Sequence, residues 1–348
     1  MLNVIFSILI IPFLPVFMYG ELPFSSGQEM TSPVSAEVLG DASQKTEAGG
    51  QCVGDGSQGF ENQNLFPLNQ PADTAFIPTR KPDYADVKIW SGSSVVIDVD
   101  SGTLLEYADG RKKTQIASLT KIMTAVLTVE NVKDLDEEVI ITPAVLNVYG
   151  TTVGCPTSVF CNSQKLVAGE KISVKNLLMA MLLDSANDAA TALGVHVGGT
   201  SQGFVDMMNA KAKELGLKDT HFCTPSGLEI DGEEDQCYSS AYDIARIAAY
   251  SLKHELIWDI MRTKEATVTS ADGKWVHQLK NTDMLLEQMA DCLGGKTGFT
   301  PLAGKSLLLA AIDPTGKHRI IAVILNDESR WTDMKTLVAW TFDNYEWK

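Results

Sequence analysis

The stretch LGGKTGFTPLAGKSLLLAAIDPTGKHRIIAVILND, residues 293–327, decides the fold class. It holds three strand-like apolar runs, at 293–300, 305–313 and 318–327, and a Pro-Thr-Gly turn precedes the last of them. Far upstream, SSVVIDVD and GTLLEYAD (93–109) flank an Asp-Ser-Gly turn, which is the pattern of a hairpin. Strands at both ends of the folded part predict one antiparallel sheet, completed where the two chain ends meet.

Between these two groups of strands, apolar residues recur at the i, i+3, i+4 spacing of helices, with Ser or Thr near several starts as caps. The predicted helices are KIMTAVLTVEN (121–131), VKNLLMAMLLDSANDAATALG (174–194), GFVDMMNAKAKELGL (203–217), SSAYDIARIAAYSLKH (239–254) and the closing RWTDMKTLVAWTFDNY (330–345). We therefore predict an α+β fold, in which an antiparallel sheet formed by N- and C-terminal strands is packed with helices and carries a helical lobe.

Composition and charge limit the classes of function. The chain has 348 residues, of which 45% are hydrophobic and 21% charged, so it is globular and long enough for a substantial core. Lys and Arg number 28 against 44 Asp and Glu, which gives a formal charge of −16. A surface with this charge does not neutralise phosphates, and nucleic acid is therefore excluded as an expected partner.

The N-terminus reads as an export segment followed by a linker. Residues 2–19 are almost wholly apolar, although no Lys or Arg precedes them and Pro12 and Pro15 interrupt the run. We expect residues 1–20 to be a signal peptide or a membrane anchor, and this makes the protein exported, either secreted or tethered to a membrane through residues 2–19. The Ser-, Gly- and Gln-rich residues 21–82 predict a disordered linker.

Six cysteines in an exported chain suggest disulfides. Cys155 and Cys161, like Cys223 and Cys237, are close enough in sequence to pair, but six cysteines allow fifteen pairings, and free buried thiols remain an alternative. No CxxC or paired Cys/His spacing is present, so we expect neither a metal site nor a cofactor.

The common catalytic motifs are absent from the sequence: it has no GxSxG, HExxH, GxxxxGK[ST] or GxGxxG. What remains is Ser118-Leu119-Thr120-Lys121. Three residues apart on a helix, Ser118 and Lys121 share a face, and a neutral lysine there can accept the hydroxyl proton. Lysine is neutral only where burial or a second cation lowers its pKa, and Lys296 is the candidate cation.

Two further elements accompany this pair. Ser185-Ala186-Asn187 interrupts an apolar helix, and because Ser and Asn are poor helix formers, we expect a break that presents both side chains to a cleft. Lys296-Thr297-Gly298 lies on a predicted strand flanked by glycines, which favours close approach of a ligand backbone to an edge strand. A helix–helix turn and a simple β-turn are the plainer alternatives, but the three elements together are far rarer than any one of them.

With SxxK, SxN and KTG in this order, the chain resembles the penicillin-recognising serine enzymes, and among them the low-molecular-weight D-alanyl-D-alanine carboxypeptidases. The resemblance runs from about residue 87 to residue 345 and includes VVIDVDSGTLLEYAD, HFCTPSGLE and YSSAYDIARIA. It implies a β-lactamase/transpeptidase-like fold and a serine DD-peptidase catalytic domain over residues 83–348. It also implies that peptidoglycan stem peptides are the substrates and that β-lactam antibiotics are covalent inhibitors.

The resemblance assigns roles residue by residue. Ser118 is expected to be the nucleophile, Lys121 its general base, and Ser185 and Asn187 to carry proton transfer and substrate amide contacts. Substrate binding falls to Lys296, Thr297, Gly298, Phe299 and Arg330, and the alternative for Arg330 is a surface arginine at a helix start. The N–H groups of Ser118 and Phe299 match the oxyanion-hole positions.

This sequence also departs from the family pattern. Phe299 follows the KTG motif where related carboxypeptidases often carry His, and Ser226 and Cys237 also occupy places that often hold His. The stretch 148–167 looks longer than usual and reads as a disulfide-closed loop near the cleft. These differences point to an altered substrate preference.

The leading hypothesis is removal of the terminal D-Ala from stem pentapeptides through an acyl-enzyme on Ser118, inhibited by penicillin. A DD-endopeptidase that cleaves cross-links would use the same residues. A non-catalytic wall-binding or sensor protein is less favoured, because every motif side chain is present. A class A β-lactamase is also disfavoured, since no acidic ExxLN segment lies between Asn187 and Lys296 and the second motif is SAN rather than SDN.

Overall fold

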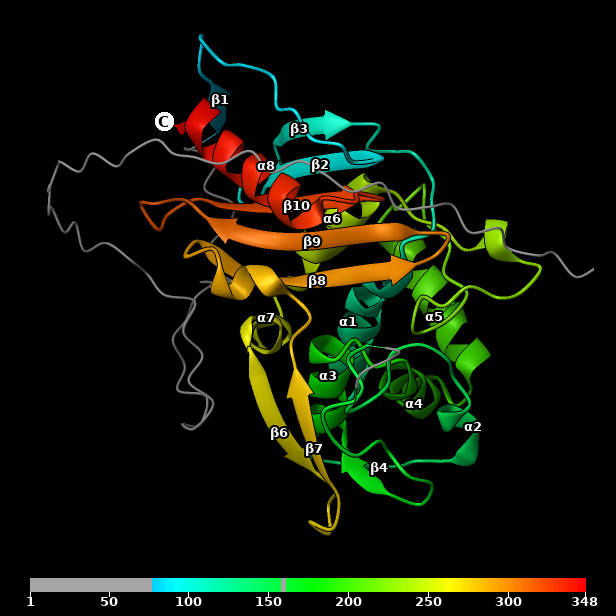
Figure 1. Cartoon of the computed structure of the whole chain (residues 1–348). Helices are drawn as coiled ribbons and strands as arrows, with labels where there is room; N and C mark the ends of the chain where they lie inside the picture. Colours follow the sequence, from blue (N-terminus) through cyan, green and yellow to red (C-terminus); the bar gives the residue numbers. More distant parts are fainter. Residues whose placement is uncertain (1–76, 158–160) are drawn as a thin grey trace, which may run out of the picture. The chain divides into compact units, whose positions relative to one another are not determined.

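The computed structural model describes residues 77–157 and 161–348 (Figure 1). The predicted export segment, and the predicted linker up to residue 76, lie outside the described residues. Strand β1 (Pro78–Arg80) pairs antiparallel with β11 (Tyr345–Trp347). Regular structure thus begins upstream of residue 83, where the sequence suggested that the folded domain starts. Among the described residues, no helix has both the length and the apolarity needed to cross a bilayer.

A five-stranded antiparallel sheet forms the centre of the fold, in the order β3-β2-β10-β9-β8. The strands are β2 (Ser93–Asp98), β3 (Leu104–Ala108), β8 (Cys292–Thr300), β9 (Gly304–Ile312) and β10 (Arg319–Leu325). Because β10 pairs with β2, the sheet joins the two ends of the described chain, and the predicted architecture is confirmed. Strand β8, which carries the KTG motif, lies at the edge.

Both faces of the sheet are buried, which explains why β10 is apolar from Ile320 to Leu325. Ile321 and Val323 point into the core shared with α1 (Lys121–Asn131) and α6 (Ala241–Ser251). Their neighbours Ile320 and Ala322 point to the opposite face, covered by α8 (Arg330–Asn344; Figure 1). This alternation is the two-residue period of a strand, and each fully buried Ile contributes about 1.5–3 kcal/mol to stability.

The helical lobe follows α1 in sequence. Its helices are α2 (Pro143–Leu146), α3 (Val174–Leu183), α4 (Asn187–Gly198) and α5 (Ser201–Glu214), with α7 (Glu255–Arg262) below the edge strand. Two small antiparallel sheets pair β4 (Glu138–Ile140) with β5 (Lys171–Ser173) and β6 (Glu265–Thr269) with β7 (Val276–Lys280), and only the second pair is a hairpin. The hydroxyls of Ser173, Thr200 and Ser240 cap α3, α5 and α6, as the sequence predicted in general terms.

Both candidate cysteine pairs form disulfides. Cys155 bonds to Cys161 within the 148–167 loop, and Cys223 bonds to Cys237 across the loop that precedes α6. For these four cysteines the sequence left open disulfides or free thiols, and the structure shows the two disulfides between sequence neighbours.

Candidate active site

Ser118 lies in a short 3₁₀ turn, Ala117–Thr120, that runs directly into α1. Its side chain is half-buried, whereas Ala117 and Leu119 on either side are buried. Ala117 has φ of 47°, in the left-handed region that a residue with a Cβ rarely adopts. Gly227 packs against this turn so closely that a Cβ there would lie 2.0 Å from the Ala117 carbonyl oxygen. The surrounding structure therefore holds the strained turn, and with it the serine, in place.

Lys121 begins α1 one helical turn after Ser118, and its side chain is completely buried. Its Nζ lies 2.8 Å from Ser118 Oγ, 2.7 Å from Asn187 Oδ1 and 2.8 Å from the Ser226 carbonyl oxygen. Asn187 is itself oriented, because its Nδ2 donates to the Tyr149 carbonyl oxygen at 2.8 Å and this turns Oδ1 toward the lysine.

These three contacts fix the direction of the lone pair of a neutral Lys121. The Asn187 Oδ1 and the Ser226 carbonyl can only accept hydrogen bonds, so both N–H bonds of a neutral amine point to them. The lone pair then faces Ser118 Oγ, whose hydroxyl donates to it. This arrangement is a serine–base pair within hydrogen-bonding distance, which is what activation of the nucleophile requires.

The pKa of Lys121 is lowered well below its ordinary value. Burial is the largest cause and the positive charge of Lys296 the next, and the carboxylate of Asp188 opposes both. No carboxylate is recorded in an ion pair with Lys121 among the described residues. Burial without such a partner favours the neutral amine, and only a neutral Lys121 can accept the proton of Ser118.

The SxN motif forms the predicted break between two helices. Helix α3 ends at Leu183, α4 starts at Asn187, and Ser185 between them has φ of 59°. Lys296 Nζ donates to Ser185 Oγ at 2.9 Å, which connects this break to the edge strand. The second and third motifs thus meet the first through two lysines, Lys121 contacting Asn187 and Lys296 contacting Ser185.

Lys296 is buried in β8, and its Nζ also donates to the Thr297 carbonyl oxygen at 3.0 Å. Burial, followed by the charge of Arg330, lowers the pKa of Lys296 to about 7, while Asp283 acts in the opposite direction. The Asp283 carboxyl is buried too, and burial raises its pKa to about 6. Lys296 therefore stays close to the boundary between its charged and neutral forms at neutral pH.

Packing within the protein accounts for two glycines of β8, whereas the sequence suggested close approach of a ligand backbone. A Cβ on Gly295 would lie 2.5 Å from the Leu308 carbonyl oxygen and 2.6 Å from Asp283 Oδ2, and one on Gly298 would lie 2.9 Å from the Ile116 carbonyl oxygen. The close neighbours are the protein's own atoms. Gly295 lets the edge strand pack against β9 and the Asp283 side chain, and Gly298 lets it approach the segment that leads to Ser118.

Phe299 and Arg330 occupy contrasting positions. The Phe299 side chain is 59% exposed at the end of the strand. Arg330 starts α8, and its Nη1 donates to the carbonyl oxygens of Gly298, at 2.9 Å, and Ser306, at 3.2 Å. Arg330 is half-buried and bonded to the β8 backbone, so it is not the surface arginine of the alternative interpretation.

Several residues that shape this site were not singled out for it by the sequence. The Ser226 carbonyl, Tyr149 and Asp283 come from loops or buried turns outside the motifs, whereas Asp188 directly follows Asn187 in α4. A backbone carbonyl leaves no trace in residue type, and no local spacing connects these segments. Only the fold brings them to the lysines.

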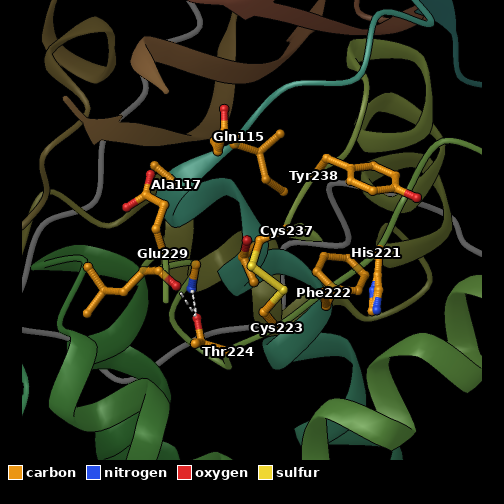
Figure 2. Close-up of a pocket in the computed structure, with 13 residues that line it drawn as sticks. Gln115, Ala117, His221, Phe222, Cys223, Thr224, Glu229, Cys237 and Tyr238 are labelled. Carbon is orange, nitrogen blue, oxygen red and sulfur yellow. Dashed lines mark hydrogen bonds between the residues drawn. A yellow bond between two sulfur atoms is a disulfide. The ribbon is translucent and has the colours of Figure 1, made fainter. Parts of the chain in front are cut away.

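Behind the nucleophile turn lies a small cavity, shown in Figure 2. Gln115, Ala117 and Tyr238 line it together with the Cys223–Cys237 disulfide, and its volume is about 20 Å³. That is room for about one water molecule and far too little for a peptide. The cavity is therefore not the place where a peptide substrate would bind.

Known proteins resemble this chain over most of the residues that the structure describes. The family described as D-alanyl-D-alanine carboxypeptidase matches residues 79–329. The carboxypeptidase DacD of Escherichia coli is 30% identical over 295 residues, 83% of this chain and 69% of the relative. DacF of Bacillus subtilis is 33% identical over 259 residues, 73% of this chain and 62% of the relative. An Escherichia coli D-alanyl-D-alanine endopeptidase is 28% identical over 262 residues, 73% of this chain and 77% of the relative.

Solved structures show the same fold. A putative penicillin-binding protein homologue of Mycobacterium tuberculosis superimposes with a TM-score of 0.67 at 28% identity, covering 76% of this chain and 96% of that one. The Streptomyces K15 DD-transpeptidase gives a TM-score of 0.65 at 27% identity, covering 74% and 99%. The chain therefore belongs to the D-alanyl-D-alanine carboxypeptidase family of serine peptidases, as its three motifs predicted.

Proposed function

We propose that the protein removes the terminal D-Ala from peptidoglycan stem pentapeptides through an acyl-enzyme on Ser118. One observation carries this proposal: Lys121 is fully buried, has two acceptor-only partners and lies 2.8 Å from Ser118 Oγ. A serine activated in this way, beside a cationic edge strand, suits acyl transfer from a peptide that ends in a carboxylate.

The chemistry follows from the contacts. Ser118 Oγ attacks the carbonyl carbon of the penultimate D-Ala and its proton passes to Lys121 Nζ. The oxygen of the tetrahedral intermediate is held by the N–H groups at Ser118 and Phe299, an arrangement worth about 3–4 kcal/mol per donor where it has been measured. Collapse breaks the amide bond, and Lys121 returns the proton to the amine of the departing D-Ala, with Ser185 placed to assist. A water molecule, deprotonated by Lys121 in turn, then hydrolyses the ester on Ser118.

Recognition of the substrate carboxylate falls to β8. Lys296 supplies positive charge and Thr297 a hydroxyl donor, while Arg330 adds charge from behind the strand through its bonds to Gly298 and Ser306. A β-lactam presents a carboxylate and a strained cyclic amide in a similar arrangement. Its ring therefore opens on Ser118, and no leaving group departs, so we expect a persistent acyl-enzyme.

The two disulfides support export. Disulfides persist in oxidising compartments, and both of these close loops next to the site. We propose that residues 78–348 act outside the cytoplasm as the catalytic domain. Residues 1–20 would serve as the signal peptide or anchor, residues 2–19 as the membrane tether if the leader is retained, and residues 21–77 as the linker.

Mass spectrometry of muropeptides tests the proposal. Residues 78–348 are incubated with pentapeptide monomers and with cross-linked dimers, beside the matched Ser118→Ala variant. Loss of one alanine from pentapeptides, absent with Ser118→Ala, is the expected result. Conversion of dimers to monomers would instead indicate the endopeptidase, which the similarity to the Escherichia coli enzyme keeps as the second candidate. No change in either substrate would contradict both.

A further inference from the structure

The segment Lys280–Asp283 bridges the second and third motifs. Its Lys280 N–H donates to Asp184 Oδ1 at 2.7 Å, and the Thr282 N–H donates to the Leu183 carbonyl oxygen at 3.2 Å, immediately before the SxN break. The Asn281 side chain is bonded to the carbonyls of Met261 and Thr263, at 2.8 and 2.9 Å. The backbone of Thr282 is therefore held from both sides.

From this position Thr282 reaches the third motif. Its Oγ1 lies 2.7 Å from Oγ1 of Thr297, and either hydroxyl can be the donor. Thr297 is 6% exposed, and among the described residues no other group is recorded as a hydrogen-bond partner of its hydroxyl. The direction of the Thr297 proton thus depends on Thr282.

The chemistry of the ligand settles that direction. A carboxylate only accepts hydrogen bonds, so Thr297 has to donate to it, and a hydroxyl has a single proton. Thr297 must then accept from Thr282. We propose that Thr282 is a positioning residue for carboxylate recognition: its hydroxyl donates to Thr297 Oγ1 and turns the Thr297 proton toward the substrate. This inference rests on the proposed function, which gives Thr297 its ligand.

The neighbouring cations do not replace this donor. Lys296 Nζ already donates to Ser185 Oγ and to the Thr297 carbonyl, and Arg330 Nη1 is bonded to two backbone carbonyls. Their charge attracts a carboxylate but does not orient it. A relay from Thr282 through Thr297 adds direction, and each bond in such a chain polarises the next.

Thr282→Val tests the relay, because valine keeps the shape of the side chain and removes only the donor. The matched variant Thr282→Ser restores the hydroxyl. We expect Thr282→Val to raise KM for the pentapeptide about 3- to 10-fold with little change in kcat, which corresponds to the loss of one ordinary hydrogen bond. Thr282→Ser should stay within about twofold of the parent, and neither variant should lower the melting temperature by more than about 4 °C.

A second measurement separates orientation of the carboxylate from general damage to the site. The rate of acylation by benzylpenicillin is compared with that by its methyl ester, which lacks the carboxylate. We expect Thr282→Val to slow only the reaction of the free acid. If Thr282→Val slows acylation by both compounds equally, or leaves KM for the pentapeptide unchanged, the role of Thr282 is overturned while the proposed function stands. Absence of turnover in the parent protein would overturn the proposed function, and this inference with it.

Discussion

Two groups of lysines in this protein behave in opposite ways. Near the surface of the helical lobe, Lys253 and Lys211 lie 2.9 and 3.0 Å from the carboxylate of Glu130, and Tyr250 and His254 also bond to it. In the candidate active site, Lys121 and Lys296 are buried, and within residues 77–157 and 161–348 neither is recorded in an ion pair with a carboxylate.

The pKa values follow this difference. Although burial acts in the opposite direction, the hydrogen bonds around Glu130 lower the pKa of its carboxyl to about 2. Hydrogen bonds to Glu214 and Glu130 likewise outweigh burial and raise the pKa of Lys211 above its ordinary value. In the cleft, burial lowers the pKa of Lys121 well below its usual range and that of Lys296 to about 7. An ion pair keeps a lysine charged and inert, whereas burial without one makes it a base.

The strongest test of this contrast removes one lysine from each group. Lys121→Met should reduce the rate of acylation by a fluorescent penicillin about 10²- to 10⁴-fold, because the general base is lost. Lys253→Met should leave that rate unchanged. Circular dichroism should show that both variants are folded. Acylation of Lys121→Met within tenfold of the parent rate would contradict the assignment of the base.

Glu130→Gln should affect stability and spare activity. The folded pKa of Glu130 lies below the unfolded value, so its contribution to stability is present above about pH 4.5 and is lost as the pH falls toward 2. Since the Glu130 side chain is partly exposed, solvent screening limits the cost to about 1 kcal/mol at pH 7. Urea unfolding of parent and variant at pH 7 and pH 4 measures it. A difference in the free energy of unfolding between parent and variant that is larger at pH 4 than at pH 7 would contradict the predicted direction of the pH dependence.

Asp283→Asn should produce the smallest effect, a displaced pH profile. Ionised Asp283 raises the pKa of Lys296, so removing its charge should lower that pKa and neutralise Lys296 at a lower pH. A neutral Lys296 attracts the substrate carboxylate less, and KM for the pentapeptide should therefore begin to rise at a lower pH than in the parent. Measuring KM from pH 5 to pH 9 checks this, and displacement to higher pH would show that the two groups are not coupled in this way.

Local sequence patterns predicted the main elements well. The runs that became β8, β9 and β10 are long and apolar, and the helix interrupted at Ser185 breaks where its polar residues predicted. The elements that were not predicted are short and mostly exposed, such as the hairpin of β6 and β7. Such strands depend on their partner rather than on their own hydrophobicity.

The same limit applies to the candidate site. The three motifs could be recognised in the sequence because each consists of particular residue types at a fixed spacing. Their side chains are the ones that meet in the candidate active site. The Ser226 carbonyl accepts a hydrogen bond from Lys121, which is 105 residues away in the sequence. The Thr282 hydroxyl bonds to that of Thr297, which is 15 residues away. The glycines of β8 also took their meaning from neighbouring strands and turns. Long-range packing, which no local pattern encodes, supplied these parts.

The most direct test of the account is the pH dependence of acylation of the parent protein by a β-lactam, measured by stopped flow from pH 5 to pH 10. If Lys121 is neutral at pH 7, the second-order rate constant has reached its maximum there and does not rise at higher pH. A rate constant that instead increases about tenfold per pH unit between 7 and 10 would show a lysine with its ordinary pKa. That result would contradict the claim that burial makes Lys121 the base for Ser118.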